Sequence, residues 1–167
     1  DDRFEPNDNP TQTRAVTLRT YPALLSNTDD DWFRVDVEPN QSVAVDILFS
    51  DAISDLDLFL LDAAGTNLAT SDSPSDDESV SYRNCGTAAE TIFIRIDNFG
   101  GVCNEYDLVL SELIELMDDA LEDNDTCLTP VALPLGLSRD LVLFVDPCTG
   151  DEDFDYYSIT LAAGETL

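Results

Sequence analysis

Short runs of alternating hydrophobic and polar residues make up most of the chain from Asp31 to Ser111. Each run has the length of a β-strand and ends at residues that favour turns. The expected strands are 32–37, 42–49, 56–62, 78–84, 90–97 and 105–111, with a hairpin-like turn around Gly65. No convincing long helix interrupts them. The pattern therefore predicts an all-β fold, either an antiparallel sandwich or a barrel.

The opening of this pattern occurs twice in the chain. Glu5, Asn7 and Asp8 recur 117 residues later, as Glu122, Asn124 and Asp125. The segment 31–43, DWFRVDVEPNQSV, is matched 124 residues later by 155–167, DYYSITLAAGETL. Two matches in the same order predict two copies of one domain, with seven extra residues between the motifs of the second copy.

The second copy is expected to be incomplete. We divide the chain into a β-sandwich at 1–112, a junction at 113–118 and the N-terminal part of a second sandwich at 119–167. Most strands of the first copy have no counterpart in the second, and a sandwich that lacks them cannot close its core. Two explanations stay open: the segment begins a further repeat of a longer array, or another chain completes it.

The charge of the chain excludes several classes of function. It has 36 acidic residues and 7 basic ones, all arginine, no histidine, and a net charge of -29. Such a surface repels nucleic acid and anionic membranes, because it cannot neutralise phosphates. Without histidine or lysine the chain has no His-based nucleophile or metal site and no Schiff base. We therefore expect no enzyme. A halophilic source and an extracellular calcium-loaded protein both explain the acidity.

The four cysteines predict a place outside the cytoplasm. Cys85, Cys103, Cys127 and Cys148 show no CxxC spacing, so a zinc knuckle is not expected. Local pairing, Cys85–Cys103 and Cys127–Cys148, gives one disulfide per copy; free buried cysteines are the alternative. Disulfides persist in secreted and cell-surface proteins. No signal peptide is visible at the start, and the longest apolar run, LVLFV, is far too short to cross a bilayer.

The motifs of the first copy, in their order, resemble the bacterial pre-peptidase C-terminal domain family. They are EPND at 5–8, DDDWF at 29–33, DLDLFLLDAAG at 55–65 and ETIFIRID with YDLVL at 90–97 and 106–110. The resemblance covers 1–111 and the opening of the second copy. It implies a jelly-roll β-sandwich, secreted and not itself catalytic, that is appended to peptidases or large surface proteins.

The resemblance also implies a calcium site in part of this family. The collagen-binding modules of clostridial collagenases bind calcium through an E-x-N-D segment and through the acids before the aromatic pair. The matching residues here are Glu5, Asn7, Asp8, Asp29 and Asp31 in the first copy, and Glu122, Asn124, Asp125, Asp153 and Asp155 in the second. Those modules carry a further Glu where this chain has Arg3 and Ala120, so we expect one ion instead of two.

The chemistry of these residues suits calcium, which takes about 6–8 oxygen ligands from carboxylates, amides and backbone carbonyls. The EPND segment offers two carboxylates and an amide within four residues. An EF-hand is excluded, because Trp32 stands where the first loop would need Gly. The competing interpretation is that the acids and amides only form turns.

Three functions stay open. The first is a calcium-stabilised extracellular module in a tandem array, for adhesion, spacing or substrate targeting. The second is a subunit of a surface filament in which a neighbouring chain completes the second repeat. The third is a binding module for an extracellular protein or polysaccharide, which needs exposed aromatic residues such as Tyr21, Tyr82 and Phe99.

Overall fold

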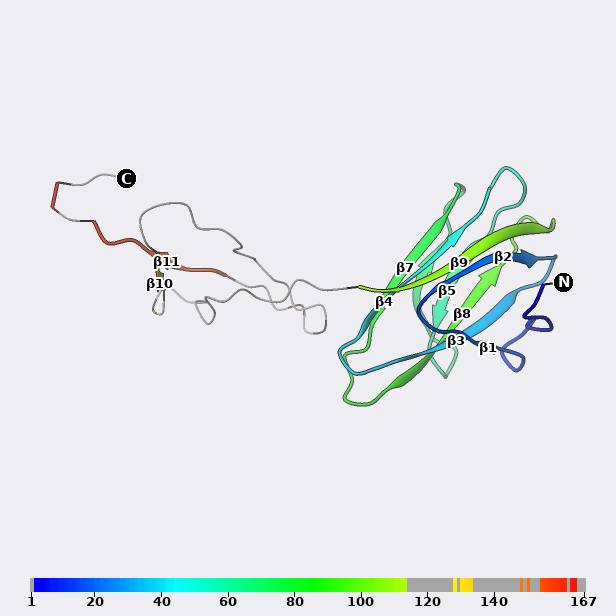
Figure 1. Ribbon diagram of the computed structural model, residues 1–167, viewed down its shortest axis with the longest axis horizontal. Coiled ribbons are helices and arrows are strands. Elements are labelled where there is room, and N and C mark those ends of the chain that lie inside the picture. Colours follow the sequence, from blue (N-terminus) through cyan, green and yellow to red (C-terminus); the bar gives the residue numbers. More distant parts are fainter. Residues whose placement is uncertain are drawn as a thin grey trace. The chain divides into compact units, whose positions relative to one another are not determined.

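The computed structural model describes residues 2–113, 128, 130–133, 148, 150, 154–161, 163 and 164. The chain divides into two compact units, Asp1–Ile114 and Glu115–Leu167, and each is described here by itself (Figure 1). The predicted junction beyond residue 113 lies outside the described residues. Within the described part no helix is long and apolar enough to cross a membrane.

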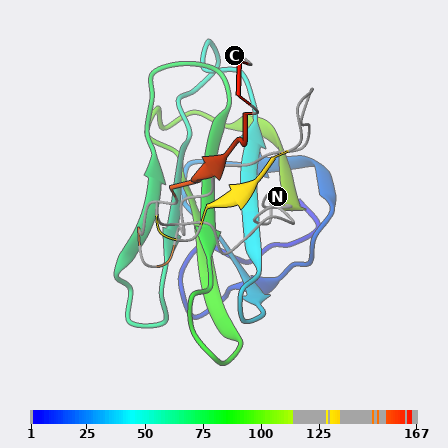
Figure 2. The same ribbon diagram turned by 90° about the vertical axis from the view of Figure 1, so that its left-hand side faces the viewer.

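The first unit is a two-layer β-sandwich. One sheet has the order β1 (Arg14–Ala15), β3 (Asp31–Val37), β8 (Glu90–Asp97), β5 (Asp57–Leu61) and β6 (Asn67–Ser71). The other has the order β2 (Thr20–Ser26), β9 (Asn104–Glu112), β4 (Ser42–Leu48) and β7 (Glu78–Arg83). Neighbouring strands are antiparallel, apart from the short parallel pair β1–β3. The predicted all-β sandwich of jelly-roll type is confirmed (Figure 2).

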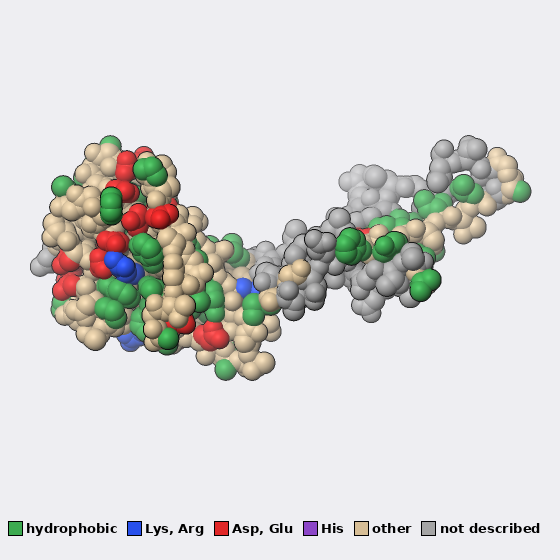
Figure 3. Space-filling view, turned by 180° about the vertical axis from the view of Figure 1, so that it is seen from behind, with side chains coloured by type: hydrophobic (Ala, Val, Ile, Leu, Met, Phe, Trp, Pro, Cys, Tyr) green, Lys and Arg blue, Asp and Glu red, His purple; other side chains and the backbone are tan. Residues whose placement is uncertain are grey.

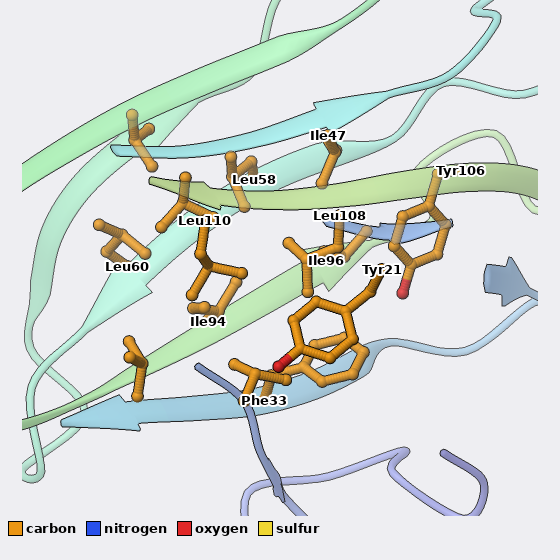
Figure 4. Close-up of a cluster of buried hydrophobic side chains, with 14 of the residues drawn as sticks. Tyr21, Phe33, Ile47, Leu58, Leu60, Ile94, Ile96, Tyr106, Leu108 and Leu110 are labelled. Atoms are coloured by element: carbon orange, nitrogen blue, oxygen red, sulfur yellow. The ribbon is translucent and has the colours of Figure 1, made fainter. Parts of the chain in front are cut away.

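The core lies between the two sheets and follows the alternation in the sequence. In β3 the buried hydrophobic side chains are Phe33, Val35 and Val37, and the residues between them point outward; Asp31, at the start of the strand, is buried as well. Figure 4 shows side chains from both sheets meeting in this layer, among them Ile94 of β8 and Leu110 of β9. Because successive side chains of a strand point to opposite faces, this period fixes which face of each strand is buried.

Two longer strands of the sandwich have no counterpart in the sequence prediction, β2 and β6. Strand β2 contains Pro22, which has no N–H to donate and argues against a strand. The β2–β9 register shifts between Tyr21 and Leu24, and Ala23 there has a φ of 54°. A β-bulge thus accommodates the proline at the edge of its sheet. Strand β6 completes the hairpin that begins at β5, around Gly65 with a φ of 82°.

The second unit contains a parallel pair, β10 (Val131–Ala132) and β11 (Tyr157–Ser158). Val131 lies opposite Tyr157 in this pair, as Arg14 lies opposite Phe33 in β1–β3. Val131 follows Arg14 by 117 residues and Tyr157 follows Phe33 by 124, the two spacings that relate the sequence motifs. The opening strand pair of the first unit therefore has a counterpart in the second, in the same register.

The predicted disulfide between Cys85 and Cys103 is wrong. Cys85 is disulfide-bonded, and Cys103 is a free, exposed thiol. The two residues precede and follow β8, whose eight residues span about 27 Å, whereas a disulfide needs Cα atoms about 4.4–6.8 Å apart. Cys148 is also disulfide-bonded. Cys127, and with it the predicted Cys127–Cys148 pairing, lies outside the described residues.

Candidate metal site

An acidic hollow of about 410 Å³ lies between the N-terminal segment and the loop before β3. Asp2, Glu5, Pro6, Asp8 and Asp29 line it. Three of the predicted ligands, Glu5, Asp8 and Asp29, therefore meet in one place, although more than twenty residues separate the two segments. We call this cavity the N-terminal hollow.

Hydrogen bonds and the partly buried ring of Phe4 hold the N-terminal segment against the sandwich. The Asp2 carboxylate accepts from the backbone N–H of Phe4 at 2.7 Å and from that of Leu25, in β2, at 3.0 Å. The Phe4 ring packs edge-on against the rings of Tyr21 and Phe33, at centroid distances of 5.6 and 5.4 Å. Such contacts anchor the segment without any ion.

Asn7 stands between the lining residues Pro6 and Asp8 in the sequence and is buried, with 1% of its surface exposed. Its carbonyl oxygen accepts from the N–H of Trp32 at 2.8 Å, which ties EPND directly to the start of β3. Its N–H donates to Glu5 Oε2 at 3.0 Å. Neither Oδ1 nor Nδ2 of Asn7 has a hydrogen-bond partner among the described residues. A buried amide without hydrogen-bond partners costs about 1–3 kcal/mol of stability. A cation coordinated by Oδ1 would offset part of this cost.

Asp31 is the buried acid of the site and is 1% exposed. Its Oδ2 accepts from the hydroxyl of the buried Tyr106 at 2.6 Å. Burial raises the pKa of Asp31 to about 7, against the opposing effect of the Tyr106 hydrogen bond, and the negative charges of Asp2, Glu5 and Asp29 raise it further. The carboxylate therefore lies within the electrostatic field of three of the four acids that line the hollow.

The pKa of Glu5 is also raised, but less strongly than that of Asp31. Burial raises its pKa, the hydrogen bond from the N–H of Asn7 opposes this, and Asp8 and Asp29 add repulsion. Like charges held close together favour a bound cation or a bound proton. Carboxylate and amide oxygens are donor types that calcium prefers, so calcium binding here stays a prediction.

Asp2 was missed by the sequence analysis, which considered Arg3 at the corresponding position. Arg3 does not line the hollow: its guanidinium lies over the Phe4 ring, 5.3 Å from the centroid, and donates to the carbonyl oxygen of Pro22 at 2.9 Å. Asp2 contributes the additional carboxylate from one position earlier. In the sequence, Asp2 is only an acid next to the expected position. The path of the folded chain shows that Asp2 lines the hollow.

In the described part of the chain, no three acidic or cysteine side chains are placed closely enough to hold a metal ion as they stand. Binding of an ion in the hollow would therefore require its acidic side chains to move closer together.

Of the predicted ligands in the second copy, only Asp155 is described. Its Oδ2 accepts from the Tyr157 hydroxyl at 2.7 Å, just before β11. Glu122, Asn124, Asp125 and Asp153 lie outside the described residues.

The aromatic residues considered for ligand binding do not form an exposed strip. Tyr21 is buried, with 3% of its surface exposed, and its hydroxyl accepts from the N–H of Thr17 at 2.7 Å. Tyr82 is half-buried and donates to Glu90 at the start of β8, whereas Phe99, 75% exposed, follows the other end of that strand. A second hollow, of about 510 Å³, is lined by Tyr82 and seven other residues and contains none of the predicted ligands.

Comparison with known proteins agrees with this fold. The sequence model of the bacterial pre-peptidase C-terminal domain matches residues 29–98. The chain is similar to the pre-peptidase C-terminal domain of a collagenase from Bacillus anthracis, with 12% identity and a TM-score of 0.50 over 63% of this chain and 100% of that one. It is also similar to PliG, a periplasmic inhibitor of g-type lysozyme from Aeromonas hydrophila, with 13% identity and a TM-score of 0.45 over 60% of this chain and 96% of that one.

The similarity to PliG is too low to support any inference, and the collagenase domain, at its identity, shows the fold alone. A search of curated proteins finds no significant match. The family match and the fold nevertheless coincide in the first unit. The predicted resemblance is thereby confirmed: residues 29–98 match the bacterial pre-peptidase C-terminal domain family, and the sandwich that contains them has the fold of such a domain.

Proposed function

We propose that this protein is a non-catalytic extracellular module in which calcium fixes the N-terminal segment to the β-sandwich. The observation that carries the proposal is the N-terminal hollow, which four carboxylates line and which lies beside EPND, where the Asn7 side chain is buried without a partner. The disulfide at Cys85 supports an oxidising compartment. Because the segment crosses from EPND to the start of β3, an ion bound there would stiffen the N-terminal entry of the domain.

We further propose that the second unit begins another copy of this domain, so that such modules occur in tandem. The parallel pair β10–β11 supports this, since its register repeats that of β1–β3. The backbone hydrogen bond from Val16 to Arg34, at 2.9 Å, also has its counterpart from Leu133 to Ser158, at 3.0 Å. A calcium ion at each entry would then set the stiffness of the array, which suits a role in adhesion, spacing or substrate targeting.

Thermal melting of the full chain with calcium and with a chelator tests the calcium proposal. A ligand that binds only the folded state stabilises it by about 2.7 kcal/mol at a concentration of 100 times its Kd. We expect calcium to raise the midpoint by roughly 5–15 °C at low salt. Equal midpoints under the two conditions would contradict the proposal.

Paired variants locate the effect. Glu5→Gln combined with Asp8→Asn removes two charges from the N-terminal hollow and should abolish most of the shift. Glu38→Gln is the matched control, because Glu38 is an exposed acid in the turn between β3 and β4. A calcium shift that survives the double variant would place the responsible ion elsewhere.

A further inference from the structure

The hollow of about 510 Å³ lies where β8 begins, at the opposite end of β3 from the N-terminal hollow. The β5–β6 turn, strands β6 and β7 and the first residues of β8 border it. Its lining combines the polar side chains of Asp62, Tyr82 and Glu90 with apolar ones such as Leu68 and Ile92, and none of its lining residues is basic. Binding sites for small ligands have volumes of roughly 300–1,000 Å³, so a long side chain fits. We call this cavity the Tyr82 hollow.

The two acids and the aromatic ring of the Tyr82 hollow come from both sheets. Asp62 directly follows β5 and Glu90 begins β8, and these antiparallel strands are neighbours in one sheet. Tyr82 belongs to β7 of the other sheet and packs against the core. Its hydroxyl donates to Glu90 Oε2 at 2.6 Å, which joins the two sheets at this end of the sandwich. The ring and the carboxylates are therefore held in place by the fold.

The Tyr82 hollow carries negative charge beside a neutral ring. Backbone hydrogen bonds, that of Thr66 above all, lower the pKa of Asp62 against the opposing effect of burial, so this carboxyl is charged at neutral pH. Burial, the hydrogen bond to Glu90 and the charges of Glu90 and Asp62 raise the pKa of Tyr82 to about 12. The Tyr82 hydroxyl thus keeps its proton and lies in the electrostatic field of both carboxylates.

Each carboxylate of the Tyr82 hollow has an oxygen available for a further donor. Asp62 Oδ1 accepts from the N–H of Thr66 at 2.7 Å and from that of Ala64 at 2.8 Å. Glu90 uses Oε2 for the Tyr82 hydroxyl. Among the described residues no hydrogen bond ends at Asp62 Oδ2 or at Glu90 Oε1. A ligand with several N–H groups can therefore bind both acids without displacing a bond of the fold.

The first unit already holds a guanidinium with the same kinds of groups. Arg95 donates to Asp30 at 2.7 Å and to Asp97 at 2.6 Å, and it lies over the rings of Phe59 and Trp32, 5.1 and 5.9 Å from their centroids. A guanidinium suits such a set, because it is planar, stacks on aromatic rings and carries five N–H donors. The Tyr82 hollow offers two carboxylates and a ring, and the arginine is what it lacks.

We propose that the Tyr82 hollow binds an arginine side chain of another protein. The guanidinium donates to Asp62 and Glu90 and stacks on Tyr82, while its methylene groups pack against the apolar lining. Charge complementarity favours this occupant, because a net charge of -29 attracts basic partners and the two carboxylates give the attraction a fixed place. The site does not depend on calcium, since the N-terminal hollow lies at the other end of β3.

Titration of the ¹⁵N-labelled full chain with the blocked tripeptide acetyl-Gly-Arg-Gly-amide, in the presence of a chelator, tests the proposal. The amide signals of Ala63, Ala64 and Thr91 should shift in a saturable way. The corresponding lysine tripeptide, with the same charge, should bind about fivefold or more weakly, because an ammonium group makes fewer paired hydrogen bonds and stacks less well. Equal affinities, or shifts spread over the whole surface, would show general attraction of cations to an acidic chain and overturn the proposal.

Matched variants locate the bound arginine. Glu90→Gln removes one charge but keeps an oxygen that can accept from Tyr82, and should raise the Kd of the arginine tripeptide by about tenfold. Glu105→Gln makes the same change at an exposed position of β9 outside the hollow and should leave this Kd unchanged. Equal effects of the two variants would contradict a site at the hollow. Tyr82→Leu removes the ring and should abolish the preference for arginine over lysine.

Discussion

At the scale of single residues, the features that stand out are buried polar groups without partners. Asn7 and Asp55 each bury side-chain polar atoms that have no hydrogen-bond partner among the described residues. Asp31 differs, because Tyr106 donates to it, but its other neighbours in the site are acids. Replacement of such groups by apolar residues would be a simpler route to stability. Their presence is therefore consistent with a bound cation that offsets their cost.

The raised pKa of Asp31 predicts a pH dependence of the metal-free protein. Its pKa is about 7 in the folded state and 3.8 as the ordinary value, so between these values the folded state holds a proton that the unfolded state releases. The contribution of Asp31 to stability is therefore full below about pH 4 and is lost as the pH rises to 7. Asp31→Asn should remove this slope and raise the free energy of unfolding at pH 8 by about 1–3 kcal/mol.

Urea unfolding in the presence of a chelator, at pH 5 and at pH 8, measures this effect. Asp36→Asn is the control, because Asp36 lies in the same strand on the exposed face. An Asp31→Asn variant that keeps the wild-type difference between the two pH values would show that Asp31 does not titrate in this range. With calcium present the variant should lose its advantage if the ion is bound as proposed, because Asp31 was predicted as one of its charged ligands.

At the scale of elements, the loops at the end of β8 are fixed by contacts as specific as those of the strands. Ser54 Oγ donates to Asn98 Oδ1 at 2.9 Å, and the N–H of Gly100 donates to the carbonyl oxygen of Asp55 at 3.2 Å. These bonds join the loop before β5 to the loop after β8. The close approach of the two loops requires a residue without a side chain at position 100.

Gly100→Ala should therefore destabilise the protein. A Cβ atom at this position would lie 2.2 Å from Ser54 Oγ and 2.9 Å from the backbone nitrogen of Asp55. Because a backbone atom cannot rotate away, we expect a loss of about 1–3 kcal/mol, as for other overpacked sites. The urea midpoint of the variant measures the loss. Phe99→Ala, a change at the exposed neighbour, is the control, and equal midpoints for the two variants would contradict this account.

At the scale of the whole molecule, the net charge of -29 opposes folding, because folding concentrates like charges. Acidic side chains outnumber basic ones on the face shown in Figure 3. Salt screens this repulsion, which stabilises the folded protein. It also weakens the ion pairs of Arg95 with Asp30 and Asp97, which destabilises it. Because repulsive pairs outnumber attractive ones, we expect added salt to stabilise the folded protein.

Sodium chloride should accordingly raise the melting midpoint of the chelator-treated protein, by several degrees between about 20 and 500 mM. A much lower concentration of calcium should achieve a larger shift, since a bound ion acts at a site and not by screening alone. A fall of the midpoint with sodium chloride would show that attractive pairs dominate. Equal effects of calcium and sodium at equal ionic strength would argue for general screening and a salt-adapted surface.

The fold could be predicted to a large extent from the sequence. Six expected strands have counterparts in β3, β4, β5, β7, β8 and β9, because half-buried strands must alternate in polarity. Strand β2 was missed because its bulge and its proline interrupt that alternation. The pairing of Cys85 with Cys103 was wrong because nearness in sequence says nothing about which end of a strand a residue occupies.

The candidate site was predictable in its members but not in its surroundings. The EPND motif and the acids before the aromatic pair named Glu5, Asp8 and Asp29 correctly as neighbours. Asp2 was not found, because in so acidic a chain nothing in the sequence distinguishes an acid that lines a site from a solvated one.

The sequence by itself determined the strand periodicity, the family resemblance and the strongly negative surface, since these depend on residue types and local spacing. Only the tertiary structure decided which acids meet and which of them are buried without partners. The reason is physical: the energy of a carboxylate depends on its distance to other charges and on its access to water, and packing between strands distant in sequence sets both.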